Sequence, residues 1–113
     1  MALTITQLFT PFQLPSSSGV LYTVPATPAT TVLKNGRIRL TNTSASAVAA
    51  TLYADAAAAP SAAGNMFLSA VSIAANASID LDLPTMRAGD TLRGFAATGS
   101  VITVHEAGGT LFS

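Results

Sequence analysis

The chain contains no cysteine, which excludes disulfide bonds, thiolate catalysis and cysteine-ligated metal sites. Its stability must therefore come from a hydrophobic core or from contacts between subunits. Charge is also scarce: charged residues make up 9% of the chain, against about 25% in an ordinary soluble domain, and the formal net charge is zero. A surface with so few charges loses little hydration when another protein covers it.

Nucleic acids and membranes are not expected as partners. Phosphate binding depends on clustered Lys and Arg, whereas here five basic residues are offset by five acidic ones. No run approaches the roughly 18 apolar residues of a membrane-spanning helix. The first seven residues, MALTITQ, have neither the basic region nor the continuous apolar core of a signal peptide. We therefore expect a protein that is made in a cytoplasm and stays there until it is assembled or released.

The segment 31–54 contains the clearest strand pattern. Ile38 and Leu40 alternate with polar residues in its first half, and Val48 and Leu52 follow the same alternation after a polar turn. A period of two is typical of a strand with one buried face. We expect these two strands to pair as an antiparallel hairpin whose apolar face is covered by the rest of the chain.

Turn signals divide the remaining sequence into short strands about every ten residues. Further strands are expected at residues 20–25, 66–73, 78–83, 91–97 and 101–107. Asn35-Gly36 is expected to form a bulge within its strand, the alanine-rich segment 54–64 a loop with at most one helical turn, and Gly108-Gly109 the start of a free tail. With 113 residues, the chain is one domain. These features predict an all-β fold: a single antiparallel β-sandwich, immunoglobulin-like or jelly-roll, of about seven or eight short strands with an extended N-terminal arm.

The shared phase of the alternating strands predicts a single hydrophobic core. Its expected members are Ile38, Leu40, Val48, Leu52, Ile79, Leu81, Leu92, Ile102 and Val104.

The N-terminal residues have a different character from the strands. Pro11 and Pro15 remove two backbone donors, which favours an edge strand or an arm over a central strand. The run Ser16-Ser17-Ser18-Gly19 is typical of a hinge. We expect residues 1–19 to be an arm and hinge and residues 20–113 the sandwich, with a plain first strand as the other interpretation. Four apolar residues of the arm are predicted to bind a partner: Leu8, Phe9, Phe12 and Leu14.

No combination of residues in the sequence indicates catalysis. His105 is the only histidine, and it occupies an outward strand position where a solvated or interface role is expected. Asp80 and Asp82 lie on one face of a strand, about 7 Å apart, which is too far for the pair to chelate calcium. No nucleophile motif or phosphate loop occurs. We expect no enzymatic activity, no catalytic residue, no metal and no cofactor.

Several blocks, in their order along the chain, resemble small β-sandwich virion proteins of tailed bacteriophages, of the capsid decoration or cement type. The blocks that carry the resemblance are LYTVP at 21–25, RLTNTS at 39–44, VAATLY at 48–53, SIDLDLP at 78–84 and AGDTL at 88–92. The resemblance covers residues 20–107, and the chain departs from it in its N-terminal arm and in the alanine-rich loop.

This resemblance implies a structural protein on the outside of the capsid, stabilising contacts between capsomers. It implies the major capsid protein as partner and a homo-oligomer, either a dimer or a trimer. The low charge and the apolar arm agree with dense packing on a lattice, where strong charge of one sign would set copies against each other. The alternative is a structural or receptor-binding module of the tail or its fibres, for which more aromatic residues would be expected.

Overall fold

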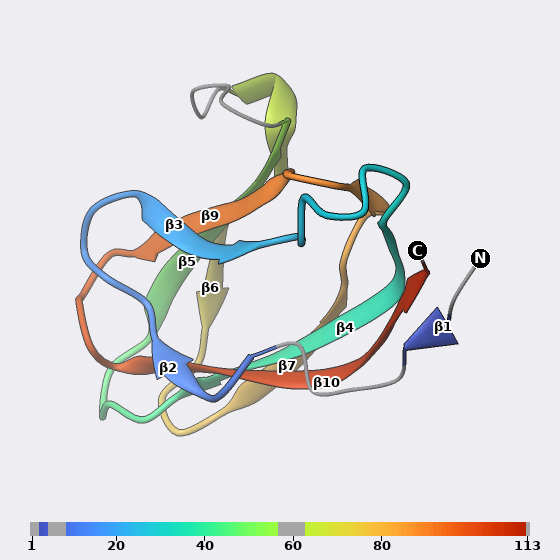
Figure 1. Ribbon diagram of the computed structural model, residues 1–113. Helices are drawn as coiled ribbons and strands as arrows, with labels where there is room; N and C mark the ends of the chain where they lie inside the picture. The colour runs from blue at the N-terminus through green and yellow to red at the C-terminus, as the bar shows by residue number, and fades with distance from the viewer. Residues whose placement is uncertain (1–2, 5–8, 57–62, 113) are drawn as a thin grey trace.

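The computed structural model describes residues 3–4, 9–56 and 63–112 (Figure 1). In this part of the chain nearly every element is a strand, joined by turns and a single 3-10 turn, η1 (Ala63–Asn65). The strands are β1 (Leu3–Thr4), β2 (Phe12–Gln13), β3 (Gly19–Thr23), β4 (Val32–Asn42), β5 (Val48–Asp55), β6 (Met66–Ile73), β7 (Ser78–Asp82), β8 (Met86–Arg87), β9 (Thr91–Ala96) and β10 (Ile102–Phe112). The predicted all-β class is confirmed.

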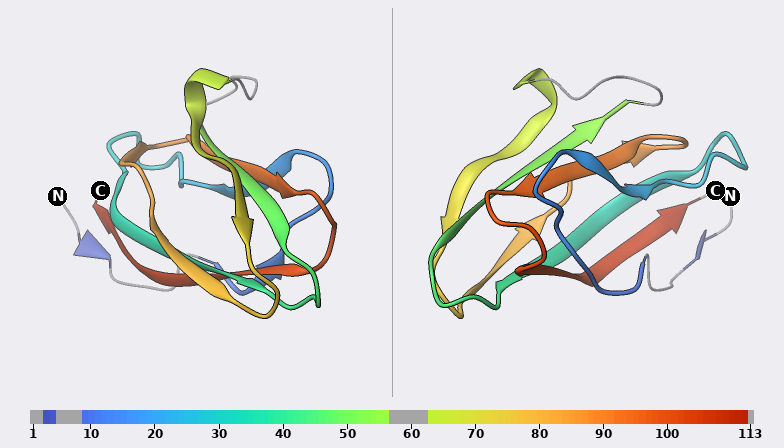
Figure 2. Two further views of the ribbon diagram at one scale, coloured as in Figure 1. Left: turned by 180° about the vertical axis from the view of Figure 1, so that it is seen from behind. Right: turned by 90° about the vertical axis from the view of Figure 1, so that its left-hand side faces the viewer.

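The strands form two antiparallel sheets that pack face to face (Figures 1 and 2). Sheet A has the order β1-β10-β4-β7, with β2 also paired to β10 and β8 to β4. Sheet B has the order β3-β9-β5-β6. The predicted antiparallel β-sandwich is therefore confirmed.

The pairing follows one rule, which identifies the sandwich as a jelly roll. β5 pairs with β6, β4 with β7, β3 with β9 and β2 with β10, so that the chain resembles one long hairpin with its tip at β5 and β6. The hairpin is rolled up, which brings β10 beside β4 and β9 beside β5 and completes the two sheets. Antiparallel strands rolled in this way form the double Greek key of jelly-roll domains.

The predicted hairpin of residues 31–54 is wrong, although both of its strands exist. β4 lies in sheet A between β10 and β7, and β5 lies in sheet B between β9 and β6. The polar turn between them crosses from one sheet to the other. Because both strands have an apolar face, placing them in opposite sheets lets the two faces pack against each other across the core.

Asn42, the last residue of β4, organises this crossing. Its side chain is fully buried, and its Nδ2 group donates to the carbonyl oxygens of Ser46 and Ile73 at 2.8 and 3.0 Å. Its Oδ1 atom accepts hydrogen bonds from the backbone N–H and the hydroxyl of Ser44 at 2.9 and 2.8 Å. One buried amide thus ties the β4–β5 crossing to the end of β6, where the next crossing begins.

The ladder between β4 and β10 confirms the predicted bulge and corrects the predicted tail. Arg37 pairs with Gly108 and Lys34 with Thr110, so Asn35 and Gly36 together oppose a single residue of β10. β10 does not end at the glycines but continues to Phe112, which pairs with Val32. Gly108 has a φ of 154°, a conformation that residues with a side chain rarely adopt, so glycine suits this irregular part of the strand.

The core agrees with the sequence prediction at its centre and differs at one edge. Seven of the nine predicted residues are buried, whereas Ile79 and Leu81 are only half-buried because β7 is the outermost strand of sheet A. The structure adds further buried apolar residues: Leu14, Val24, Leu33, Ala50, Leu68, Ile73, Leu83, Met86 and Ala96. Of the predicted loop at 54–64, Ala54 and Asp55 belong to β5, Ala63 begins η1, and residues 57–62 lie outside the described residues.

Replacing Leu40 by Ala tests the assignment of the core. Leu40 is fully buried, so we expect a loss of about 2 to 5 kcal/mol in the free energy of unfolding, measured by chemical denaturation. Leu81→Ala, the same change at a half-buried edge position, serves as the control and should cost clearly less. Equal losses for the two variants would contradict the observed arrangement.

Replacing Asn42 by Ala tests the crossing. The change leaves buried carbonyl groups without a donor, and we expect a loss of about 2 to 4 kcal/mol in the free energy of unfolding. The control is Ser46→Ala in the same turn, since Ser46 bonds to Asn42 through its backbone oxygen and not through its side chain. A loss below about 0.5 kcal/mol for Asn42→Ala would show that the amide does not hold the crossing.

Candidate functional site

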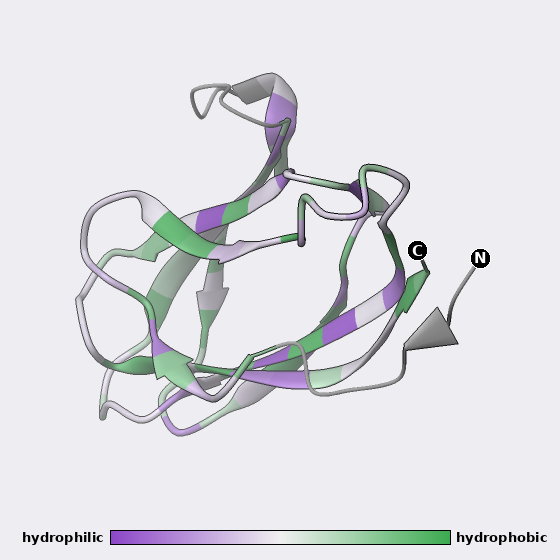
Figure 3. Cartoon of the chain, viewed as in Figure 1, coloured by the Kyte–Doolittle hydropathy of each residue, from purple (hydrophilic) through white to green (hydrophobic). Residues whose placement is uncertain are grey.

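Most of the chain's few charges lie on sheet A. Of the five basic residues, Lys34, Arg37 and Arg39 are on β4 and Arg87 is on β8, and of the five acidic residues three are on β7 and β10. Figure 3, in the view of Figure 1, shows hydrophilic segments along β4 and β10. Within the described chain, the outer face of sheet A therefore carries most of the charged side chains.

Two arginines and two aspartates on this face form what we call the charge ladder: Arg37, Arg39, Asp80 and Asp82. The β4–β7 register places Arg37 beside Asp82 and Arg39 beside Asp80. Arg39 donates two hydrogen bonds to the carboxylate of Asp80, from Nε at 2.7 Å and from Nη2 at 3.2 Å. Arg37 donates only through Nε, to Asp82 at 3.1 Å. Opposite charges in directly facing positions favour this register of the two strands.

The ladder changes the protonation behaviour of one of its pairs. Hydrogen bonding to Arg39 lowers the pKa of the Asp80 carboxyl below its ordinary value. The same contact raises the pKa of the Arg39 guanidinium. Both groups therefore remain charged at neutral pH.

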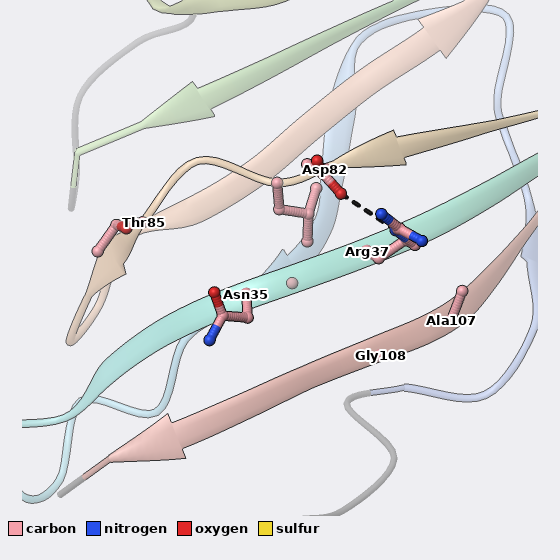
Figure 4. Close-up of a pocket in the computed structure, with 8 residues that line it drawn as sticks. Asn35, Arg37, Asp82, Thr85, Ala107 and Gly108 are labelled. Atoms are coloured by element: carbon pink, nitrogen blue, oxygen red, sulfur yellow. Dashed lines mark hydrogen bonds and ion pairs between the residues drawn. The ribbon is translucent and has the colours of Figure 1, made fainter.

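Two open hollows lie beside the ladder. The first has a volume of about 500 Å³ and lies between the end of β7 and the bulged part of β4 and β10, with Asn35, Arg37, Asp82, Thr85 and Gly108 among its lining residues (Figure 4). The second, of about 440 Å³, is lined by Arg39, His105 and Glu106, among others. Three of the residues that line the first hollow are small, namely Gly36, Ala107 and Gly108, and they lie where the β4–β10 register is irregular.

His105 is exposed on β10, and the β10–β4 register places it opposite Arg39. This is the outward position that the sequence predicts. Within the described residues, no three His, Cys, Asp or Glu side chains lie close enough together to hold a metal ion. The expectations that the chain has no catalytic residue, no metal and no cofactor remain predictions.

A second polar cluster lies on sheet B. The carboxylate of Asp55 is buried, accepts a hydrogen bond from Asn65 at 2.9 Å and lies 3.6 Å from Nε of Arg93. Asp55 ends β5 and Asn65 ends η1, so the contact holds the β5–β6 connection against the sheet. Sequence reasoning missed this cluster, because Asp55 stands in an alanine-rich segment that indicates only a loop.

The four predicted partner-binding residues do not share one surface. Leu14 is fully buried in the core, and its backbone bonds to Ile102 and Ser100 at 2.8 and 3.0 Å, so its side chain offers no surface to a partner. Phe9 and Phe12 are half-buried, with ring centroids 5.1 Å apart. Leu8 lies outside the described residues. A partner role for Phe9 and Phe12 remains a prediction.

The segment expected as an arm is joined to the sandwich in its described part. β2 pairs with β10, and the carbonyl of Pro15 accepts a hydrogen bond from the backbone N–H of Ala96 at 2.8 Å. The ring of Phe9 also lies 5.6 Å from that of Tyr22 on β3. These contacts agree with the other interpretation from the sequence, an edge strand of the sandwich.

Replacing Arg39 by Gln tests the cause of the lowered pKa of Asp80. In an NMR titration we expect the midpoint of the Asp80 carboxyl to lie below its ordinary value in the wild type and to rise in this variant. A lowered folded-state pKa adds stability above the unfolded value near pH 4, and this contribution is lost as the pH falls through the folded-state pKa. Arg37→Gln is the matched control and should shift the midpoint less, since Arg37 acts on Asp80 only through space. Equal midpoints in the wild type and in Arg39→Gln would contradict this cause.

Comparison of the chain with protein-family models, with curated proteins and with solved structures finds no match. Among the residues that the structure describes, no helix is long and apolar enough to cross a membrane. A function for this chain is therefore inferred from its own residues and geometry.

Proposed function

We propose that this chain is a structural virion protein of a tailed bacteriophage that binds the outside of the capsid shell and stabilises contacts between capsomers. In this role its partners are the major capsid protein and further copies of itself. The proposal extends the resemblance of its strand blocks to decoration and cement proteins.

The observation that carries the proposal is the uneven distribution of charge between the two sheets. The four strands of sheet B contain two charged residues, Asp55 and Arg93, and these lie next to each other. All other residues of these strands are uncharged, so the outer face of sheet B is nearly neutral, and the exposed side chains on its strands include Val20 and Val71. Because the centres of protein interfaces are depleted in charge, such a face suits contact with a protein lattice.

The jelly-roll fold is compatible with this role. Jelly rolls occur in viral capsid proteins and also in lectins and enzymes of the cupin type, so the fold alone does not decide the function. Within the described residues, the outer faces carry ion pairs, a few further charged side chains and many neutral ones, and no group of three His, Cys, Asp or Glu side chains lies close enough together to hold a metal ion. A protein that acts by covering and holding a surface needs no more than this.

The second candidate is a structural or receptor-binding module of the tail or its fibres. The two polar hollows on sheet A are the observation in its favour, because hydroxyl, amide and charged groups line them. The two roles differ in copy number: the resemblance implies hundreds of copies for a shell protein and about a dozen for a tail part.

Purified particles of the phage that encodes this chain test the proposal. We expect quantitative mass spectrometry to find the chain in capsids separated from tails, at hundreds of copies per particle. Recombinant chain should rebind to particles from which it has been stripped, and stripped particles should lose their contents at a lower temperature than rebound ones. The major tail protein, followed in the same fractions, is the control for separation. Recovery with the tails would favour the second candidate, and absence from purified particles would refute both.

A further inference from the structure

In the charge ladder, all the positive side chains lie on one strand and all the negative side chains on the neighbouring strand. Ion pairs within one chain would form equally well with the signs mixed on each strand. Both arginines lie on β4, both aspartates lie on β7, and each arginine faces an aspartate in the same row of the sheet. The side chains of the Arg37 and Asp82 pair are 56% and 77% exposed, and those of the Arg39 and Asp80 pair 54% and 43%. The ladder is thus a row of positive groups beside a parallel row of negative groups, all open to the outside.

Such a pattern is complementary to a copy of itself. A two-fold rotation about an axis parallel to the strands, midway between β4 and β7 and above the sheet, places β4 of a second copy over β7 of the first. Positions along the strands are unchanged by this rotation, so Arg39 comes to lie over Asp80 of the second copy and Arg37 over Asp82 of the second copy. The same contacts are repeated on the other side of the axis, as in every isologous dimer.

We propose that the outer face of sheet A binds a second copy of this chain, face to face, through the charge ladder. Arg37 has capacity for the additional contacts, because the one side-chain hydrogen bond that it makes to the described residues is from Nε to Asp82. The hollows beside the ladder leave space for the side chains that stand up from the facing copy. This inference does not depend on the proposed virion role.

Joining two copies through the β7 edge or the β6 edge is less favourable. Antiparallel pairing of two β7 strands would bring Asp80 and Asp82 of one copy beside the same aspartates of the other, and facing like charges destabilise such a pair. The β6 edge is interrupted twice by irregular register, between Ala50 and Leu52 and between Leu52 and Tyr53 of its partner strand. The face of sheet A is therefore the surface whose charge pattern fits a second copy.

The first measurement is the mass of the full chain in solution, by analytical ultracentrifugation at increasing concentration. We expect a dimer whose dissociation constant rises by roughly tenfold or more between about 0.05 M and about 1 M salt, because the Debye length falls to about 3 Å at the higher concentration. A monomer at every concentration in low salt would overturn the proposal. A closed trimer would also overturn it, since a two-fold contact does not generate a three-fold ring.

Charge reversal then separates contacts between copies from contacts within one chain. The double variant Arg37→Asp with Arg39→Asp carries only negative charge on the ladder, and Asp80→Arg with Asp82→Arg carries only positive charge. We expect each variant alone to be monomeric and an equimolar mixture of the two to form a heterodimer. Each variant also places like charges in facing positions of β4 and β7 of its own chain, so circular dichroism spectra that match the wild type are needed to show that both variants are folded.

The matched control places the same charges on sheet B, at two exposed serines of β6. Ser69→Asp with Ser72→Asp should dimerise as the wild type does, and mixing it with Ser69→Arg and Ser72→Arg should add no further complex. Dimers of either ladder variant alone, with wild-type affinity, would contradict the proposal. Failure of the two ladder variants to associate when mixed would contradict it as well.

Discussion

The carboxamide of Asn42 is the contact on which the crossing between the sheets depends. A jelly roll differs from a flat sheet because its long strands pass repeatedly from one layer to the other, and each passage leaves backbone groups that no strand partner can satisfy. Asn42 satisfies several of them at once, in the connection that follows β4 and at the end of β6. A hydrophobic residue of the same size would fill the space but leave those carbonyl groups without donors. The position therefore needs an amide, and burial holds this amide in one orientation.

The sequence was sufficient to predict which residues face the core, but not which strands are neighbours. Alternation of apolar and polar residues follows directly from strand geometry, and this is why Leu40, Leu92 and Val104 were assigned correctly. Alternation says nothing about pairing, so β4 and β5, adjacent in sequence, were expected to form a hairpin although they lie in different sheets. The predicted free tail after Gly108 is wrong because it also depends on pairing. Glycine weakens a strand, but here β4 pairs with the residues that follow Gly108 and the strand continues.

The candidate surface could be predicted only in part. The sequence predicts that Asp80 and Asp82 share one face of a strand. Arg37 and Arg39 are among the polar residues that alternate with Ile38 and Leu40, and all four side chains are exposed in the structure. Their pairing became visible only when β7 was placed beside β4. In the sequence, the two like charges on each strand are two residues apart, which places them on the same face. This spacing predicts ion pairs only once the two strands are known to be neighbours. Leu14 shows the opposite case, since a residue that suggested an external contact by its hydrophobicity is part of the core.

The nested pairing of the strands also has a consequence for how the domain folds. Among the described strands, β5 and β6 are the one pair of consecutive strands that are hydrogen-bonded to each other, whereas β2 and β10 come together from opposite ends of the described chain. Closing that last pair first would cost the entropy of a loop almost as long as the domain. If the β5–β6 hairpin at the tip forms first, each later pair of strands needs to close only the short loops that separate it from the pair formed before it. We therefore expect the sandwich to assemble as a zipper from the tip outward, slowly, as is usual for folds dominated by distant contacts. The order in which backbone amides gain protection from hydrogen exchange during refolding would report this sequence of events, and protection of β10 before β6 would exclude it.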